Sequence, residues 1–478
     1  MTSLRETIKS IALVSLVIMA LILSRFVLLD DTASTLETVK VVETESVNVA
    51  KYINPQSYYI SFGGLSYTKV NNTELQQDLW DALRPVITNE IQSALSVDLI
   101  DMQTYVKAFT DKSMMLRFTV GLDLGTWLTI YDDQLNIPDS LVDIRPYEIV
   151  LRADSPDRLY IYDKSAGLYY VIRHEAVESP LNDLITQVSS SGFVEYRKIS
   201  DRFSLVSTVP DSDQRFNYEL LPYQYTDLTQ GLRISNEVDT NPAAFDNSVS
   251  TIAKSVFGNR LDFVKRLKDV NDAIVLMYGY GDKALTVSQD GTVTMNQKFN
   301  SNLAQATDFK KSLAIAIGGL EQFGVVPEGL QLASVSVTDE DYRKYLFEFS
   351  YKLENTVVTQ KSGGAQVTVK GGQITEIKKN VKIVQSRIYT NVDRMFSIDN
   401  CITLNYLEVS LYYLQDNDIY DATLNNIQYY FPIRSAIEHI SLEYVQQDMT
   451  MMPVWRVVIS GRTYIFNAYN GTMIQTYR

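Results

Sequence analysis

A long apolar run near the start of the chain constrains its fold more than any other feature. Between Ser10 and Leu29 the single charged residue is Arg25. About 20 apolar residues form a helix of roughly 30 Å, which is long enough to cross a bilayer. A cleaved secretory signal has a shorter apolar core and ends in a small-x-small cleavage site, whereas this run ends in Arg25-Phe-Val-Leu-Leu. We therefore predict an uncleaved transmembrane helix over residues 10–29.

The charges that flank this run predict its orientation. Arg5 and Lys9 precede it, and Asp30 and Asp31 follow it. Positively charged flanks stay in the cytoplasm. We expect residues 1–9 to form a short cytoplasmic tail and everything after about residue 30 to be extracytoplasmic. The chain is thus predicted to be a single-pass protein of the cell membrane.

One stripe of the predicted helix is a candidate interaction surface. Its members follow a 3-4-3-4 spacing and are Ser10, Leu13, Val17, Ala20 and Ser24. Ala20 and Ser24 form a small-xxx-small pair, which lets a second helix approach closely. Small residues are common in membrane spans, so the alternative is that this stripe arises by chance and binds nothing. We name these five residues the membrane stripe.

The composition indicates a folded, acidic chain. It has 478 residues, a net charge of −14 and 31 tyrosines. Length statistics predict about two to four domains beyond the apolar run. Acidity without a cluster of Lys and Arg argues against nucleic-acid binding. Cys401 is the single cysteine, so no intramolecular disulfide can form, which favours a bacterial surface over an animal extracellular domain. We interpret Cys401 as a buried apolar residue.

Linker-like segments divide the rest of the chain. Residues 30–50 are interpreted as a tether, and SSSGF at 189–193 as a domain boundary. We predict an N-terminal α+β domain over 51–192, a middle α+β domain over 193–300 and a C-terminal α+β domain over 301–478. The predicted fold class is therefore α+β, with one N-terminal transmembrane helix and a multidomain part of antiparallel sheets and packed helices.

Local patterns predict the elements of the first domain. A helix is expected to start at Thr73, with Thr73 as N-cap and Gln76 completing a capping box, and Pro85 is expected to kink it or shift its start. Strands are expected at LRFTVGLDL, WLTIYD, YEIVLRA, RLYIYD and LYYVIR. Turn-forming DSPD and KSAG separate the last three, which predicts an antiparallel meander.

The later domains show the same alternation of patterns. Asp290-Gly291 lies between two alternating runs and predicts a hairpin. Helices are expected over residues 248–267, over residues 307–324 and around residues 420–445, which would include His439. Strands are expected on both sides of Gly371-Gly372 and in the closing segment PVWRVVISGRTYIFNAYNGTMIQTY.

A search for catalytic and metal-binding motifs gives near misses. His174 begins HEAVE, in which Glu178 stands where the HExxH zinc pattern needs its second histidine; we interpret His174 as the end of a strand. DNDIYD at 416–421 lacks the glycine and the distal glutamate of a calcium loop. No nucleophile elbow, phosphate loop or dinucleotide fingerprint is present. We therefore predict no catalytic residues, no metal site and no cofactor.

Several segments resemble one known family. They are WLTIYDDQLNIPDSLVDIRPYEIVL, LFEFSYKLENTVVTQKSGGAQVTVKGGQITEIKKNVKIV and the closing strands, which contain Pro453, Trp455, Asn467, Ala468 and Gly471. Together with the leading IKSIALVSLVIMALIL, they are similar to the YycH family of low-GC Gram-positive bacteria. The closing strands also resemble those of its partner YycI.

This resemblance implies a function. YycH-family proteins are not enzymes. With a YycI-like protein they form a membrane complex with the sensor histidine kinase WalK, whose two-component system controls cell-wall metabolism, and they usually restrain the kinase. The transmembrane helices take part in the contact, which favours an interaction role for the membrane stripe.

Two other functions remain compatible with the residues. A membrane-tethered wall hydrolase would need a concave site with two carboxylates in contrasting environments. A module that binds a peptide or wall fragment would show a cleft lined by several tyrosines. The alternative reading of the tyrosines is that they fill half-buried faces of sheets.

Overall fold

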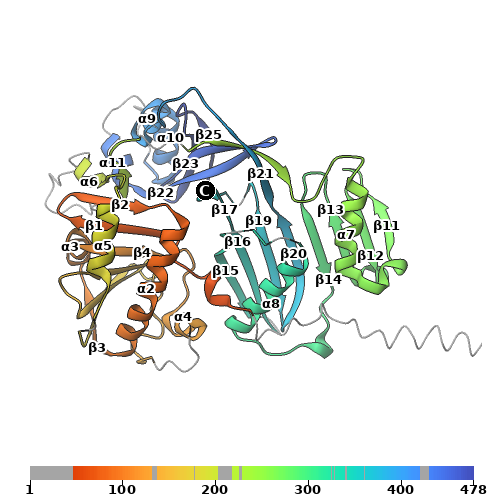
Figure 1. The fold of residues 1–478 in the computed structure, drawn as a ribbon, viewed down its shortest axis with the longest axis horizontal. Helices are drawn as coiled ribbons and strands as arrows, with labels where there is room; N and C mark the ends of the chain where they lie inside the picture. Colours follow the sequence, from red (N-terminus) through yellow and green to blue (C-terminus); the bar gives the residue numbers. More distant parts are fainter. Residues whose placement is uncertain are drawn as a thin grey trace, which may run out of the picture. The chain divides into compact units, whose positions relative to one another are not determined.

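The computed structural model describes residues 47–131, 137–176, 178–202, 218–225, 229–324, 326–327, 329–339, 342–359, 361–419 and 430–478. These residues form three sheets with helices packed against them (Figure 1). All strand pairs are antiparallel except β18 with β22. The predicted α+β class with antiparallel sheets is confirmed. None of the helices in these ranges is long and apolar enough to cross a membrane, and residues 10–29 lie outside them.

The N-terminal sheet has nine strands in the order β3-β7-β6-β5-β4-β1-β2-β8-β9. Their bounds are β1 Ser57–Gly63, β2 Ser66–Val70, β3 Ala94–Ile100, β4 Ser113–Arg117, β5 Glu148–Arg152, β6 Arg158–Asp163, β7 Leu168–His174, β8 Tyr196–Lys198 and β9 Leu220–Pro222. Its helices are η2 Val49–Tyr52, α2 Thr73–Gln92, α3 Met102–Thr110, α4 Leu124–Tyr131, α5 Leu181–Ser190 and α6 Ile199–Arg202. The predicted meander is present as β5, β6 and β7.

Strict alternation along the strands gives this sheet two different faces. Aliphatic side chains fill one face, where α2 and α5 cover them; they include Ile60, Leu116, Ile149, Leu151, Ile161 and Ile172. The opposite face carries tyrosines and charged residues, and α3 covers part of it with Tyr105 and Phe109. A strand places successive side chains on opposite faces, so each strand contributes to both layers.

Three local predictions for this domain are wrong. Of the strand predicted at LRFTVGLDL, only Leu116 and Arg117 are in a strand, because β4 ends at Arg117 and the last residue of the segment begins α4. The described residues of WLTIYD, 127–131, belong to α4 instead of a strand, because Asp123 caps a helix there: its carboxylate accepts the backbone N–H of Thr126 at 2.7 Å. The N-cap of α2 is Asn72, which accepts from Leu75 N at 2.8 Å. The side chain of Gln76 donates to Val70 O at 2.7 Å instead of closing a capping box. α2 continues through Pro85.

The central sheet has eight strands in the order β11-β12-β13-β14-β20-β19-β16-β15. Their bounds are β11 Lys265–Lys268, β12 Ile274–Tyr278, β13 Lys283–Val287, β14 Val293–Gln297, β15 Gln331–Asp339, β16 Arg343–Ser350, β19 Gly364–Lys370 and β20 Gln373–Asn380. Its helices are α7 Phe245–Phe257, η3 Gly258–Phe263, η4 Gly279–Gly281, η5 Ser301–Leu303 and α8 Phe309–Gln322. The hairpin at Asp290-Gly291 joins β13 and β14, as predicted.

Helix α8 lies close against this sheet because of one glycine. A Cβ at Gly319 would lie 2.4 Å from Cδ1 of Ile374 on β20. Leu313, Ile317 and Leu320 of the same helix are buried on the sheet. Glycine lowers helix propensity, so its presence here is explained by the close packing.

The C-terminal sheet contains the order β17-β18-β22-β23-β10-β21, and β24 pairs with β23 and β25. Its strands are β10 Gly231–Asn236, β17 Lys352–Leu353, β18 Thr356–Val358, β21 Lys382–Ile388, β22 Ile437–Gln447, β23 Thr450–Ile459, β24 Arg462–Asn467 and β25 Met473–Tyr477. Its helices are α9 Ile398–Leu404, α10 Tyr406–Asp416 and α11 Tyr430–Ser435. The predicted closing strands are confirmed as β23, β24 and β25.

Two predicted helices end earlier than expected. The helix predicted over 248–267 stops at Phe257, and residues 265–268 form β11. Within the described part of the helical region predicted around 420–445, α11 ends at Ser435. The strand β22 begins at Ile437. His439 therefore lies on a strand, which its pairing with Val458 of β23 stabilises.

The sheets cross the predicted domain boundaries. β8 and β9, which follow residue 192, extend the N-terminal sheet. Strands from both 193–300 and 301–478 share the central sheet, and β10 pairs with β21 and β23 in the C-terminal sheet. The division into three domains, over residues 51–192, 193–300 and 301–478, stays a prediction.

Candidate functional site

A row of polar and aromatic side chains crosses one end of the N-terminal sheet. Directly paired residues of neighbouring strands project from the same face. The register pairs Ser57 with Arg117 and Arg117 with Glu148. It then pairs Glu148 with Tyr162 and Tyr162 with Tyr169. Five strands therefore place one continuous polar row on the face opposite the aliphatic core.

Arg117 is the centre of this row. Its Nε and Nη2 donate to Glu148 Oε1 at 2.9 and 2.8 Å. Its Nη1 and Nη2 bind the carboxylate of Glu219 at 3.0 and 2.9 Å. The second oxygen of Glu148 accepts hydrogen bonds from the hydroxyls of Tyr105 and Tyr218, each at 3.1 Å. We call Arg117, Glu148 and Glu219 the ion cluster; their exposed fractions are 4%, 1% and 5%.

The guanidinium of Arg117 keeps its charge although it is buried. Burial opposes the charge on Arg117, but the carboxylates of Glu219 and Glu148 hold the pKa of its guanidinium well above the usual value. The rings of Tyr59 and Tyr147 have their centroids 5.0 and 5.7 Å from the guanidinium carbon, which adds cation–π attraction. The cluster thus links β4, β5 and the segment before β9.

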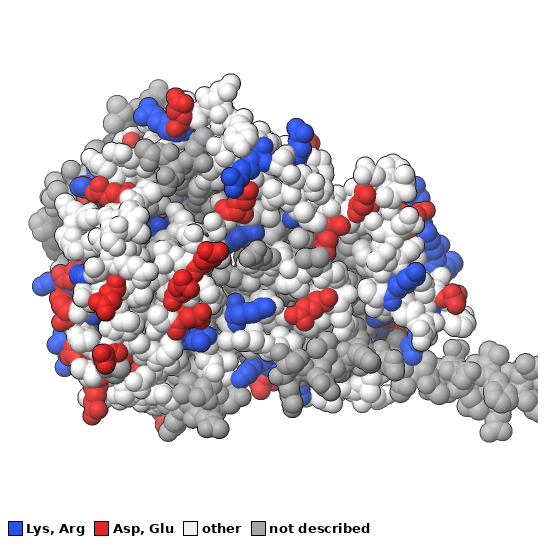
Figure 2. Space-filling model, viewed as in Figure 1, with Lys and Arg blue, Asp and Glu red and all other residues white. Residues whose placement is uncertain are grey.

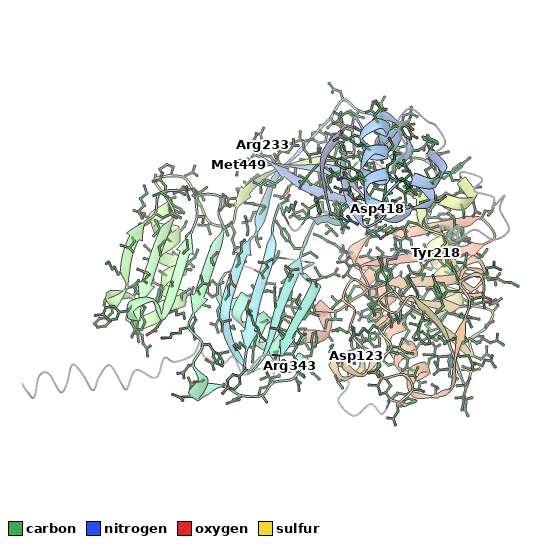
Figure 3. All side chains as sticks on the ribbon, turned by 180° about the vertical axis from the view of Figure 1, so that it is seen from behind. Asp123, Tyr218, Arg233, Arg343, Asp418 and Met449 are labelled. Atoms are coloured by element: carbon green, nitrogen blue, oxygen red, sulfur yellow. The ribbon has the colours of Figure 1, made fainter. Side chains whose placement is uncertain are left out.

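A cavity of about 480 Å³ adjoins the ion cluster. Tyr147, Tyr162, Tyr169 and Tyr218 line it, and residues 435–438 at the end of α11 and start of β22 form a further wall. The rings of Tyr162 and Tyr169 are stacked with centroids 4.5 Å apart. Figure 3 marks Tyr218 at the end of the N-terminal sheet that faces the C-terminal strands and helices. Several tyrosines therefore line a concave surface of the size usual for ligand pockets.

A second cavity, of about 310 Å³, lies between the N-terminal and C-terminal sheets. Tyr59 and Lys69 line it from the first sheet, and His439 lines it from β22. Nδ1 of His439 lies 3.5 Å from Nη1 of Arg117, so this side chain connects the second cavity to the ion cluster. Burial, together with the charges of Arg117 and Lys69, lowers the pKa of His439 well below its usual value. The imidazole is therefore neutral.

No protein-family model and no curated protein matches the sequence. Among solved structures, YycH from Bacillus subtilis is similar to this chain with a TM-score of 0.52 and 13% sequence identity; the match covers 87% of this chain and 96% of the other.

The chain has a YycH-like fold. The resemblance seen in the sequence is thereby confirmed at the level of the fold. A second solved structure, an uncharacterized protein from Eubacterium rectale, matches 56% of the chain with a TM-score of 0.34 and 10% identity. The ion cluster and both cavities lie within one compact unit, Ser46–Arg478.

The membrane stripe lies outside the described residues of this YycH-like fold. Its members Ser10, Leu13, Val17, Ala20 and Ser24 stay a prediction. His174 ends β7, as predicted, and Cys401 is fully buried on α9, where burial raises the pKa of its thiol to about 12. Within the described ranges, no group of three or more His, Cys, Asp and Glu side chains is placed to hold a metal ion.

Sequence reasoning missed the ion cluster. Arg117 ends the apolar run MMLR, and Glu148 begins EIVLR. A charged residue at an inward position of an apolar strand must find a partner, so each was a detectable signal. Their partnership was not detectable, because Glu148 lies 31 residues and Glu219 lies 102 residues from Arg117.

The buried carboxyl of Glu90, next to His174, should make the stability of the protein depend on pH. Glu90 on α2 is 3% exposed, and its Oε2 lies 3.8 Å from Nε2 of His174, too far for a hydrogen bond. Burial raises the pKa of the Glu90 carboxyl from 4.5 to about 8. The folded state then holds a proton that the unfolded state releases, so stability should fall as pH rises from about 4.5 to 8.

We expect the substitution Glu90→Gln, which mimics the protonated acid, to remove this dependence. The variant should match the natural protein near pH 4.5 and be more stable by a few kcal/mol at pH 8.5. Thermal unfolding midpoints measured at several pH values check the expectation. Parallel curves for the two proteins would contradict it.

Proposed function

We propose that this chain is a non-enzymatic regulatory protein, anchored in the cell membrane, that acts with a YycI-like membrane protein on a WalK-like sensor histidine kinase. In this proposal it restrains the kinase of the two-component system that controls cell-wall metabolism. The YycH-like fold, which extends over 87% of the chain, is the observation that carries the proposal. The apolar run at residues 10–29 supplies the anchor.

The contacts of the ion cluster support a structural role for its carboxylates. Glu148 and Glu219 bind the same guanidinium, and Glu148 also accepts two tyrosine hydroxyls. A glycosidase-type site instead holds one carboxylic acid and one carboxylate in contrasting environments across a substrate. The cluster therefore favours the regulatory function over the wall hydrolase.

The proposed mechanism is helix packing within the bilayer. The membrane stripe would pack against the spans of the kinase and favour one of two arrangements of those spans. A coupling free energy of about 1–3 kcal/mol changes an equilibrium roughly 5- to 150-fold. Small side chains at Ala20 and Ser24 allow the close approach that such packing needs.

Bulky residues in the membrane stripe should release the kinase. In the variant Ala20→Leu with Ser24→Leu, we expect weaker co-purification of the kinase and a rise in kinase-dependent wall-gene expression within roughly 5- to 150-fold. The matched control is Ser15→Leu, since in a helix with 3.6 residues per turn Ser15 would lie opposite the centre of the membrane stripe.

The control variant should leave both readouts unchanged. Equal effects of the two variants would indicate a general defect in membrane insertion. Unchanged association and expression in the Ala20 and Ser24 variant would contradict the proposed contact. An unrelated span in place of residues 10–29 that kept full regulation would contradict it more strongly.

A further inference from the structure

The cavity between the N-terminal and C-terminal sheets is lined by more basic than acidic side chains, although the chain as a whole is acidic. Lys69, Lys352 and Arg456 line it, from β2, β17 and β23. The described carboxylates of the lining are Glu354 and Glu443. Glu354 is held by Nε of Arg387, which is not part of the lining, at 2.9 and 3.0 Å. On the surface seen in Figure 2, by contrast, acidic and basic residues are interspersed.

The two lysines reach the cavity without a carboxylate in contact. Among the described residues, no Asp or Glu oxygen lies within 4 Å of either ammonium group. Lys69 lies over the ring of Tyr59, with Nζ 5.5 Å from its centroid. Nζ of Lys352 donates to Oε1 of Gln76 at 2.9 Å. Arg456 meets Glu443 at 3.9 Å, the outer limit of an ion pair.

The position of Lys352 is set by a short hairpin. β17 and β18 are joined by Glu354 and Asn355, both with positive φ, and Oδ1 of Asn355 accepts the backbone N–H of Thr73 at the start of α2. Gln76, one turn further along α2, is fixed by its own bond to Val70 O. Its carbonyl oxygen therefore orients Lys352 without neutralising the charge.

The electrostatics of the lysines agree with this geometry. Burial and the neighbouring charge of Lys69 lower the pKa of Lys352 to about 8, and burial lowers the pKa of Lys69. For Lys69, the charges of Glu219 and Glu443 oppose this effect without cancelling it. Ammonium groups behave in this way when nearby negative charge does not fully compensate the loss of water. A bound anion would supply that counter-charge.

Other parts of the lining are apolar and aromatic. Trp455 is fixed by the bond from its Nε1 to Phe396 O at 2.9 Å, and Tyr225 packs against its ring edge-on at 5.7 Å. The remaining apolar members include Leu220, Pro222, Met395, Ile440 and Leu442. A ligand in this cavity would thus meet charged donors and a rigid apolar surface.

We propose that the cavity between these two sheets binds a small organic anion, with its acidic group between Lys69 and Lys352 and its apolar body against Trp455. This inference does not depend on the kinase or on the membrane stripe. It assigns the cavity a ligand class by charge and shape: an anionic group with an attached apolar or aromatic part.

Calorimetric titration of the full chain in a non-ionic detergent tests the proposal. The probes are N-acetylglycine, N-acetylphenylalanine and N-acetyltryptophan, the carboxamide of each, and inorganic phosphate. The two larger acids should bind at least tenfold more tightly than their neutral amides. They should also bind more tightly than N-acetylglycine and phosphate, which lack an apolar body.

Substitution of the lysines should weaken this binding. Lys69→Met and Lys352→Met should each lower the affinity for the acids roughly 10- to 100-fold, the range for a lost hydrogen bond to a charged group. Lys69→Arg, which keeps the charge, should bind nearly as well as the natural protein. The matched control is Lys254→Met, which removes an exposed lysine of α7.

The dependence of binding on pH provides a second readout. Affinity for the acids should fall as pH rises through about 8, because Lys352 loses its proton, and this fall should be absent in Lys352→Met. The titratable and charged groups of the cavity lining besides Lys352 are Tyr59, Lys69, Tyr196, Tyr225, Glu354, His439, Glu443 and Arg456, and Lys352 itself donates to the neutral amide of Gln76. Thermal unfolding of each variant shows whether it is folded.

The proposal is overturned if no acid binds, if acids and amides bind equally, or if folded methionine variants keep full affinity. Phosphate that binds as tightly as N-acetyltryptophan would overturn the role of the apolar surface. None of these outcomes bears on the regulatory function, which is measured by kinase association.

Discussion

Replacing Arg117 by methionine should lower the free energy of unfolding by about 3–5 kcal/mol, because it leaves two buried carboxylates without their cation. Glu148 and Glu219 are 1% and 5% exposed, and both bind the guanidinium. Hydrogen exchange of the β4 and β5 amides and the thermal unfolding midpoint measure the loss. We expect faster exchange in these two strands first.

Two further variants separate charge from packing. The triple variant Arg117→Met, Glu148→Gln and Glu219→Gln removes both carboxylates and should regain part of the stability, since no uncompensated charge is left. Arg197→Met removes a more exposed arginine, paired with Glu195 at 2.8 Å, and should have a small effect. An Arg117 variant as stable as the Arg197 variant would show that the ion cluster does not hold the sheet.

The variant Trp80→Ala should lose a similar amount, about 3–5 kcal/mol, for a different reason. Trp80 on α2 is fully buried, and its ring meets Phe118, Trp127 and Tyr131 edge-on at 5.9–6.1 Å. Alanine would leave a cavity beneath α4 and remove these aromatic contacts. The thermal midpoint should fall, and hydrogen exchange should increase in α2 and α4.

The control for this prediction is Trp80→Phe. Within the described residues, Nε1 of Trp80 has no hydrogen-bond partner, so phenylalanine removes a buried unsatisfied donor while it keeps a ring. Its loss of stability should be clearly smaller than that of the alanine variant. Equal losses, or exchange that changes first in the distant strands β23 and β24, would contradict the packing explanation.

Helix α4 shows where local sequence patterns were insufficient. WLTIYD is a short apolar run, and such runs are compatible with a strand or with a buried helix. The capping contact of Asp123 with Thr126 and the packing of Trp127 against Trp80 favour the helix. The strand predicted there required the run to alternate between two faces, but Trp127, Leu128 and Ile130 are all buried.

His439 is the converse case. Its segment mixes polar and apolar residues without a clear period, and the neighbouring pattern suggested a helix. Pairing with β23 makes this segment a long strand, because nine successive residue pairs form from His439 to Gln447, and a tenth forms at Ile437 beyond a register shift. A prediction from local sequence cannot include these pairs, since the contribution of a strand partner depends on tertiary structure.

The sequence by itself determined the meander of β5, β6 and β7, the hairpin at Asp290-Gly291, helix α8, the closing strands and the buried state of Cys401. These features follow from side-chain alternation, helical spacing and turn residues, which act over a few neighbours. Tertiary structure alone decided that Arg117 meets Glu148 and Glu219, and that Lys69 and Lys352 share a cavity. Those contacts depend on the register of several strands and on the approach of two sheets, and residues far apart in the chain carry no local signal of either.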